Sequence, residues 1–120
     1  VSNSRTLSVQ TPPMTPINRT TGMHIAESLK KIWQKDFPTS LQKVYLFGSV
    51  ARDQAHEDSD IDIAVVCVPF ARSKIREARA LYASFPAMDA RVSLVVIHPQ
   101  ELEQKTSVLP ATIRSEGIAI

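Results

Sequence analysis

Cysteine is almost absent from this 120-residue sequence, where Cys67 stands alone. A single cysteine cannot form a disulfide within the chain, and it cannot supply a cysteine-based zinc site. Long hydrophobic runs are missing as well, since no apolar stretch approaches the roughly 18 residues that a membrane-spanning helix needs. These absences exclude a disulfide scaffold and an integral membrane protein. They predict one small soluble domain, which we expect in the cytoplasm.

Negative charge is absent from the first 22 residues, which contain Arg5 and Arg19 but no aspartate or glutamate. Residues 23–120 hold 12 basic and 12 acidic side chains, so this part of the chain is neutral overall. A protein that grips nucleic acid through its phosphates carries a basic excess. The balance therefore disfavours nucleic acid as a partner and favours a small molecule or a protein.

The first 22 residues also have little apolar surface to bury, because they include three prolines and eight serines or threonines. Such a segment cannot offset the entropy lost on ordering. Its acid-free composition is similar to that of an organellar transit peptide, but the prolines and the lack of a helical period argue against one. We predict a disordered tail over residues 1–22 and one globular domain over residues 23–120.

The remaining pattern predicts alternating helices and strands. Apolar residues at helical spacing predict helices over residues 21–37 and 70–85, and shorter helices over 101–105 and 110–115. β-prone runs predict three strands, over residues 44–47, 61–68 and 92–97. This order indicates an α/β (α+β) fold with helices packed on a small mixed sheet.

Two aspartates mark the start of the second predicted strand. Side chains alternate along a strand, so Asp60 and Asp62 point to one face, with Cα atoms roughly 6.6 Å apart. Ile61 and Ile63 then enter the core. Two carboxylates this close repel each other unless a cation lies between them. Mg²⁺ suits such a pair, because it binds one or two carboxylates together with substrate phosphates.

Groups that bind anions follow the first predicted strand. Gly48 lets the backbone approach a phosphate closely, and Ser49 adds a hydroxyl donor. Arg52 offers a guanidinium fork that matches phosphate oxygens. Each feature alone is common in turns and on wet strand faces. Together, with ten residues between Ser49 and Asp60, they predict a site for a metal and a triphosphate.

The string FGSVARDQAHEDSDIDIAVV resembles the minimal nucleotidyltransferases (MNT) of the DNA polymerase-beta superfamily. The resemblance covers Met23–Ile120 in element order and is strongest over Tyr45–Val66. It implies a polymerase-beta-like fold and the transfer of a nucleoside monophosphate, AMP from ATP, to a hydroxyl group with release of pyrophosphate.

The same resemblance implies a role for each matching residue. Asp60 and Asp62 would be catalytic and would hold two Mg²⁺ ions, while Gly48, Ser49 and Arg52 would bind the triphosphate.

The chain departs from the family pattern at two positions. Asp53 stands where the family has glycine, and aspartate tolerates a left-handed turn. Ser93 stands where the family places a third carboxylate, and a neutral hydroxyl is a poor ligand for Mg²⁺ and a poor base. Asp89 lies on the same strand face but roughly 13 Å further back in a regular strand. Only a bulge or a difference in register would bring Asp89 to the third carboxylate position, and we expect it to be a surface acid at the start of the strand.

These features leave three functions open. One-domain relatives are often antitoxins that transfer AMP to a tyrosine of a helical HEPN-type partner, so the resemblance implies such a partner or a second copy of the chain. The alternative is a catalytically weakened protein that binds a nucleotide or a partner, because Ser93 replaces the third carboxylate. A plain structural domain would bind no nucleotide.

Overall fold

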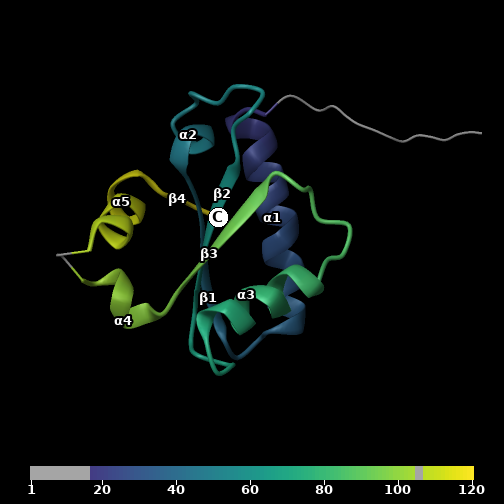
Figure 1. Ribbon diagram of the computed structural model, residues 1–120, viewed down its shortest axis with the longest axis vertical. Helices are drawn as coiled ribbons and strands as arrows, with labels where there is room; N and C mark the ends of the chain where they lie inside the picture. Colours follow the sequence, from purple (N-terminus) through teal and green to yellow (C-terminus); the bar gives the residue numbers. More distant parts are fainter. Residues whose placement is uncertain (1–16, 105–106) are drawn as a thin grey trace, which may run out of the picture.

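The computed structural model describes residues 17–104 and 107–120, which form one mixed sheet with helices on both faces (Figure 1). The elements in chain order are α1 (Arg19–Asp36), β1 (Leu41–Phe47), α2 (Gly48–Ala51), β2 (Ile61–Cys67), α3 (Lys74–Ala83), β3 (Val92–Ile97), α4 (Pro99–Leu102), α5 (Val108–Glu116) and β4 (Ile118–Ala119). The predicted α/β architecture with a small mixed sheet is confirmed.

The four strands lie in the order β3-β2-β1-β4. β1 pairs antiparallel with both β2 and β4, whereas β2 and β3 are parallel. Parallel neighbours need a crossover connection, which α3 provides between β2 and β3. This topology brings the end of β1 and the start of β2 together at the end of the sheet that carries α2 (Figure 1).

Helix α1 begins earlier than predicted. The Asn18 side chain caps it by accepting a hydrogen bond of 2.8 Å from the Thr21 amide. Gly22 is buried, and a methyl group built on it would lie 2.5 Å from Val50 Cγ1, so α1 packs closely on α2 here. Residues 19–22 therefore belong to a helix and not to a tail. Of the tail predicted for residues 1–22, residues 1–16 lie outside the described residues.

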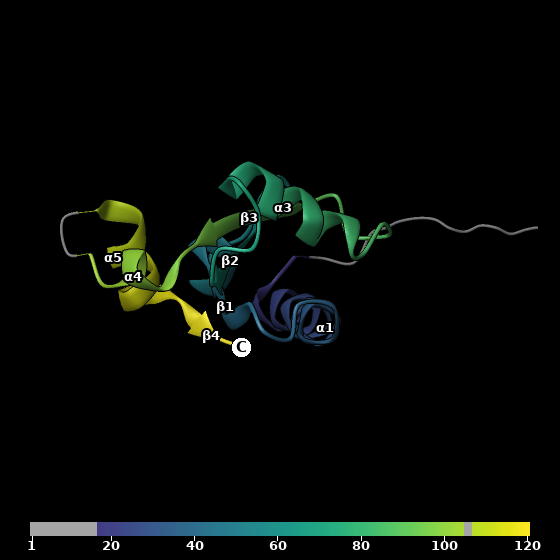
Figure 2. The same cartoon turned by 90° about the horizontal axis from the view of Figure 1, so that it is seen from below.

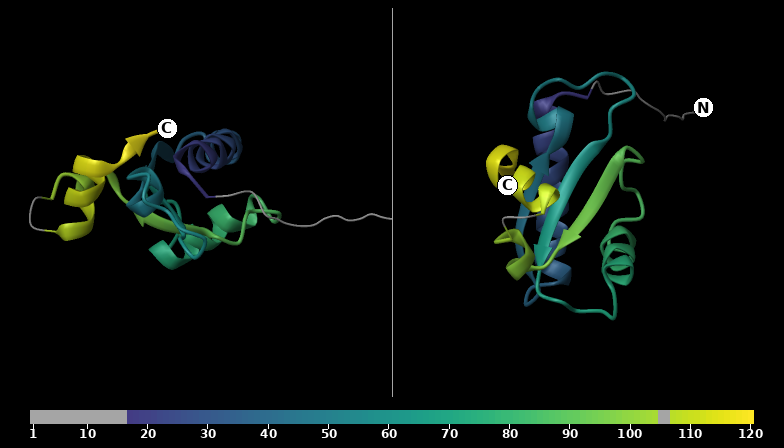
Figure 3. Two further views of the ribbon diagram at one scale, coloured as in Figure 1. Left: turned by 90° about the horizontal axis from the view of Figure 1, so that it is seen from above. Right: turned by 60° about the vertical axis from the view of Figure 1, so that its left-hand side comes forward.

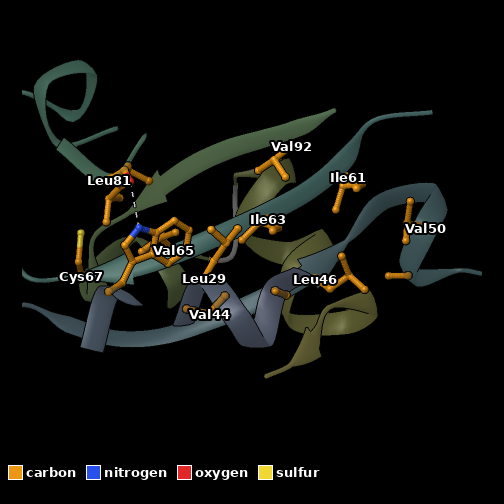
Figure 4. Close-up of a cluster of buried hydrophobic side chains, with 14 residues drawn as sticks. Leu29, Val44, Leu46, Val50, Ile61, Ile63, Val65, Cys67, Leu81 and Val92 are labelled. Atoms are coloured by element: carbon orange, nitrogen blue, oxygen red, sulfur yellow. Dashed lines mark hydrogen bonds between the residues drawn. The ribbon is translucent and has the colours of Figure 1, made fainter. Parts of the chain in front are cut away.

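The core fills both faces of the sheet. α1 and α3 cover one face, and α4 and α5 lie on the other (Figures 2 and 3). The first face buries alternate residues of β1 and β2, among them Val44, Leu46, Ile61, Ile63 and Val65 (Figure 4). Fully buried Trp33 donates a hydrogen bond of 3.0 Å from Nε1 to the Leu81 carbonyl, which ties α1 to α3. The second face buries Phe47, Ala64, Val66, Ile97 and Ile113.

A buried carboxylate joins α3 to the end of β3. Glu77 is 0% exposed, and its Oε1 lies 2.7 Å from His98 Nε2. Burial alone would raise the pKa of Glu77, but hydrogen bonds from His98 and from the amides of Phe70 and Ala71 lower it overall. The base of α3 is therefore held by a satisfied polar network.

Two short elements were not predicted, the single-turn helix α2 and the two-residue strand β4.

Cys67 is a buried thiol in the apolar strand β2, and its burial raises its pKa to about 11. Within the described residues, no helix is both long enough and apolar enough to span a bilayer.

Candidate active site

The Gly48 backbone lies against the Asp62 carboxylate. Phe47 and Asp62 are register partners on β1 and β2, so the residue after Phe47 turns over the start of β2. Gly48 has a φ of +76°, and a methyl group built on it would lie 2.2 Å from Asp62 Oδ2. Only glycine permits both this conformation and this approach. In the sequence, ten residues separate the Gly48-Ser49 pair from the aspartate pair, and the fold brings Gly48 and Asp62 together. We call this contact the Gly48 corner.

The two predicted carboxylates interact electrostatically. Asp62 is half-buried at the start of β2, and exposed Asp60 lies just before that strand. Burial raises the pKa of Asp62, the Asp60 carboxylate raises it further, and the Arg52 guanidinium lowers it. Neither carboxylate has a hydrogen bond or ion pair with any other described residue. A cation that sits beside both would relieve this repulsion, so the donor set suits Mg²⁺.

Ser93 takes the position that the sequence predicts. In the parallel pairing of β2 with β3, Ser93 is the register partner of Asp62. Asp89 instead forms an ion pair with Arg91, whose Nε and Nη2 lie 3.0 and 2.7 Å from its two carboxylate oxygens. These hydrogen bonds lower the pKa of Asp89. Among the described residues, no group of three or more His, Cys, Asp or Glu side chains is placed to hold a metal.

The predicted phosphate-binding side chains differ in their surroundings. The Ser49 hydroxyl has no hydrogen-bond partner among the described residues, so it is available to a ligand. Arg52 is exposed and forms an ion pair with Glu116 of α5, with Nη1 3.0 Å from Oε1. Such an exposed pair contributes little to stability. Phosphate oxygens can therefore compete with Glu116 for the Arg52 guanidinium.

The loop between α2 and β2 is shaped by its own polar residues. Asp53 has a φ of +61°, so aspartate does adopt the left-handed turn that the family gives to glycine. Ser59 is buried, its hydroxyl accepts a hydrogen bond of 2.9 Å from the His56 amide, and its own amide donates to the His56 carbonyl. This double contact sets the chain direction just before Asp60.

Sequence reasoning missed one residue that supports the corner. Arg19, predicted to lie in the tail, donates from Nε to the Ala51 carbonyl at 3.0 Å, which satisfies the end of α2. Asn18 was the available signal, since asparagine before a run of helix-compatible residues is a common N-cap.

We expect Gly48→Ala to lower the free energy of unfolding by about 1–3 kcal/mol, because alanine is strained at this φ and its methyl group overlaps Asp62. Urea unfolding measures the cost. The matched test repeats the substitution in an Asp62→Ala background, where the overlap is gone and only the backbone strain remains. If Gly48→Ala lowers the free energy of unfolding equally in both backgrounds, the Gly48 backbone and the Asp62 carboxylate are not in close contact.

The chain is similar to known proteins in both sequence and fold. Residues 26–114, about three quarters of the chain, match the family described as "Nucleotidyltransferase domain". No curated protein matches significantly. A presumed nucleotidyltransferase from Sulfolobus solfataricus has the same fold, with 21% identity and a TM-score of 0.60, over 84% of this chain and 80% of that one.

Two further solved structures are similar. A chain in a mutant of the MntA–HpeT toxin–antitoxin is 29% identical, with a TM-score of 0.53, over 78% of this chain and 69% of that one. A chain in a toxin–antitoxin with AMP-PNP is 27% identical, with a TM-score of 0.51, over 78% and 70%. The match over residues 26–114 decides the family. This chain belongs to the nucleotidyltransferase domain family.

Proposed function

We propose that this nucleotidyltransferase uses Mg²⁺ to transfer the AMP group of ATP to a hydroxyl group of a partner protein, in the manner of an MNT antitoxin. The observation that carries the proposal is the Gly48 corner, where the backbone meets the Asp62 carboxylate with room for no side chain. A phosphate bound at that turn lies beside the carboxylate pair. The likeness to a toxin–antitoxin chain crystallised with AMP-PNP supports ATP as the donor.

In the proposed reaction, the acceptor oxygen forms a bond to the α-phosphorus while the bond from that phosphorus to the bridging oxygen breaks. Pyrophosphate leaves, and the acceptor hydroxyl loses its proton to solvent or a nearby carboxylate. Asp60 and Asp62 would hold Mg²⁺, which supplies charge neutralisation for the triphosphate when bound. Gly48 and Ser49 would position the phosphates, and Arg52 would exchange Glu116 for phosphate oxygens.

A protein acceptor is supported by the toxin–antitoxin likeness. The structurally similar MntA–HpeT chain belongs to a two-protein system, and we propose a helical HEPN-type protein as the partner here. A tyrosine hydroxyl is the proposed acceptor group.

The test uses the purified full chain, Mg²⁺ and ATP labelled at the α-phosphate, with and without the protein encoded by the adjacent gene. We expect label on the partner protein, none when EDTA is present, and none when the label is on the γ-phosphate. Label transferred from the γ-phosphate would indicate a kinase and would contradict the proposal.

A second function is favoured by Ser93, which leaves the Asp62 register position on β3 without a carboxylate. In that case the chain binds a nucleotide or its partner and neutralises the partner by occlusion alone. Inhibition of the partner that survives both Asp60→Ala and Asp62→Ala, with no label transfer by the wild type, would establish this function instead.

A further inference from the structure

A groove of about 460 Å³ runs along β3, between α3 on one side and α4 with α5 on the other. We call it the β3 groove. None of the proposed catalytic or phosphate-binding residues lines it. Its floor is apolar, formed by residues 94–97, and Ile75 and Leu109 stand on its opposite walls. Lys74 of α3 forms an ion pair with Glu101 of α4, which links the two walls.

The open side of β3 is already covered in part. The Tyr82 hydroxyl accepts a hydrogen bond of 3.0 Å from the Leu94 amide and lies 3.4 Å from the Val92 carbonyl. Because Tyr82 occupies these edge groups, an extended peptide cannot add to this part of the strand as in β-augmentation. Farther along, the apolar floor between Ile75 and Leu109 suits a helix that inserts apolar side chains into the β3 groove.

The outer face of α3 is positively charged. Glu77 is the only acid in residues 70–88, and it is 0% exposed. Arg72, Arg76 and Arg79 are exposed, and their guanidinium groups have no partner among the described residues. Ile75, between them, is 67% exposed. Arginine around an exposed apolar side chain is typical of protein interfaces. The positive charge of these arginines favours an acidic partner.

Other occupants fit this surface less well. The segment 1–16 contains Arg5 and no acid, so its charge has the wrong sign. In a second copy of the chain, the loop 53–60 carries four acids, but Ala55 is its only apolar residue and would leave the β3 groove empty. Nucleic acid would match the arginines but not the apolar floor.

The β3 groove also leads toward the candidate active site. Val95 is part of its floor, and Ser93 lies two residues earlier on the same strand face, roughly 7 Å away. Ser93 is the register partner of Asp62. A protein seated in the β3 groove thus has its surface next to the carboxylate pair.

We infer that the β3 groove and the arginines of α3 dock the acceptor protein through an acidic amphipathic helix. As the docking place of an acceptor, this surface rests on the proposed function. As a protein-binding surface, it is tested without any nucleotide, so the two proposals fail separately.

The probe is a fluorescent amphipathic helical peptide with leucines along one face and glutamates elsewhere, titrated with the full chain and followed by anisotropy. We expect binding that weakens by about 10-fold or more in Ile75→Glu and in Arg79→Glu. Both residues are exposed, so the variants should fold, which thermal unfolding checks. Lys31→Glu and Lys35→Glu on exposed positions of α1 change the net charge by as much as Arg79→Glu and by more than Ile75→Glu, and as controls they should bind like the wild type. A peptide with lysines in place of glutamates should bind about 10-fold more weakly or worse.

Several results would overturn the inference. No binding of the acidic peptide to the wild type, or an equal loss in the α1 controls, would remove the docking surface even if label transfer from ATP is intact. Tighter binding of a single-stranded oligonucleotide, abolished by Arg79→Glu, would make it a nucleic-acid surface. Self-association that Arg79→Glu abolishes would make it an interface between copies of this chain. If instead the peptide binds as expected while label transfer is absent, the proposed function fails and the docking surface stands.

Discussion

Asp62→Asn is expected to reduce label transfer from α-labelled ATP by about 100-fold or more. Asparagine keeps the shape of the side chain, so it fits against Gly48, but it removes one of the two charges that would hold Mg²⁺. Asp60→Asn should have a similar effect. Initial rates of transfer at saturating Mg²⁺ measure both. Asp58→Asn, in the exposed loop that also holds Asp60, is the matched control and should change the rate by no more than about twofold.

Stability distinguishes this loss of function from a loss of fold. Burial and Asp60 raise the pKa of Asp62, so the folded protein disfavours its charged form. The contribution of the Asp62 carboxyl to the free energy of unfolding is therefore largest at low pH, and it is lost as the pH rises through the raised pKa. Asp62→Asn lacks that decline, and we expect it to be at least as resistant to urea as the wild type at neutral pH. A variant that is inactive because it unfolds would contradict the catalytic role.

The elements with a helical apolar period or a continuous apolar run were predictable from the sequence. α1 buries residues at helical spacing, and β2 is buried along almost its whole length. The aspartates before and within β2 could be placed on one face from the alternation of side chains along a strand. The start of β1 was not predicted, because Gln42 and Lys43 are exposed and carry no apolar pattern. β4 was not predicted for a related reason, because two residues are too few to show a period and their pairing with β1 is a long-range contact.

The candidate site shows the same division between local and long-range information. Gly48, Ser49 and the aspartate pair follow from spacing within one short string. The ion pair between Arg52 and Glu116 joins residues 64 apart in sequence, so no local sequence pattern predicts it. Asp89 has its partner only two residues away, in Arg91. That pairing supports the prediction that Asp89 is a strand-start acid and does not replace the third carboxylate.

Ser93→Asp is the complementary prediction, a gain of function. Ser93 is half-buried and pairs in register with Asp62, so an aspartate there would place a third carboxylate beside the existing pair. A carboxylate at this position can bind Mg²⁺ or accept the proton of the acceptor hydroxyl, and a positioned base contributes about 100-fold or more. We expect label transfer to rise by about 10-fold or more over the wild type.

The metal dependence of folding provides a second measurement of the same variant. Three neighbouring carboxylates repel one another, so without Mg²⁺ Ser93→Asp should melt at a lower temperature than the wild type. Added Mg²⁺ should raise its melting temperature by more than that of the wild type, because the metal binds only the folded site. Ser93→Asn is the uncharged control and should show neither change. If Ser93→Asn gains as much transfer as Ser93→Asp, the gain does not come from a carboxylate, and the prediction that this position lacks a third carboxylate is wrong.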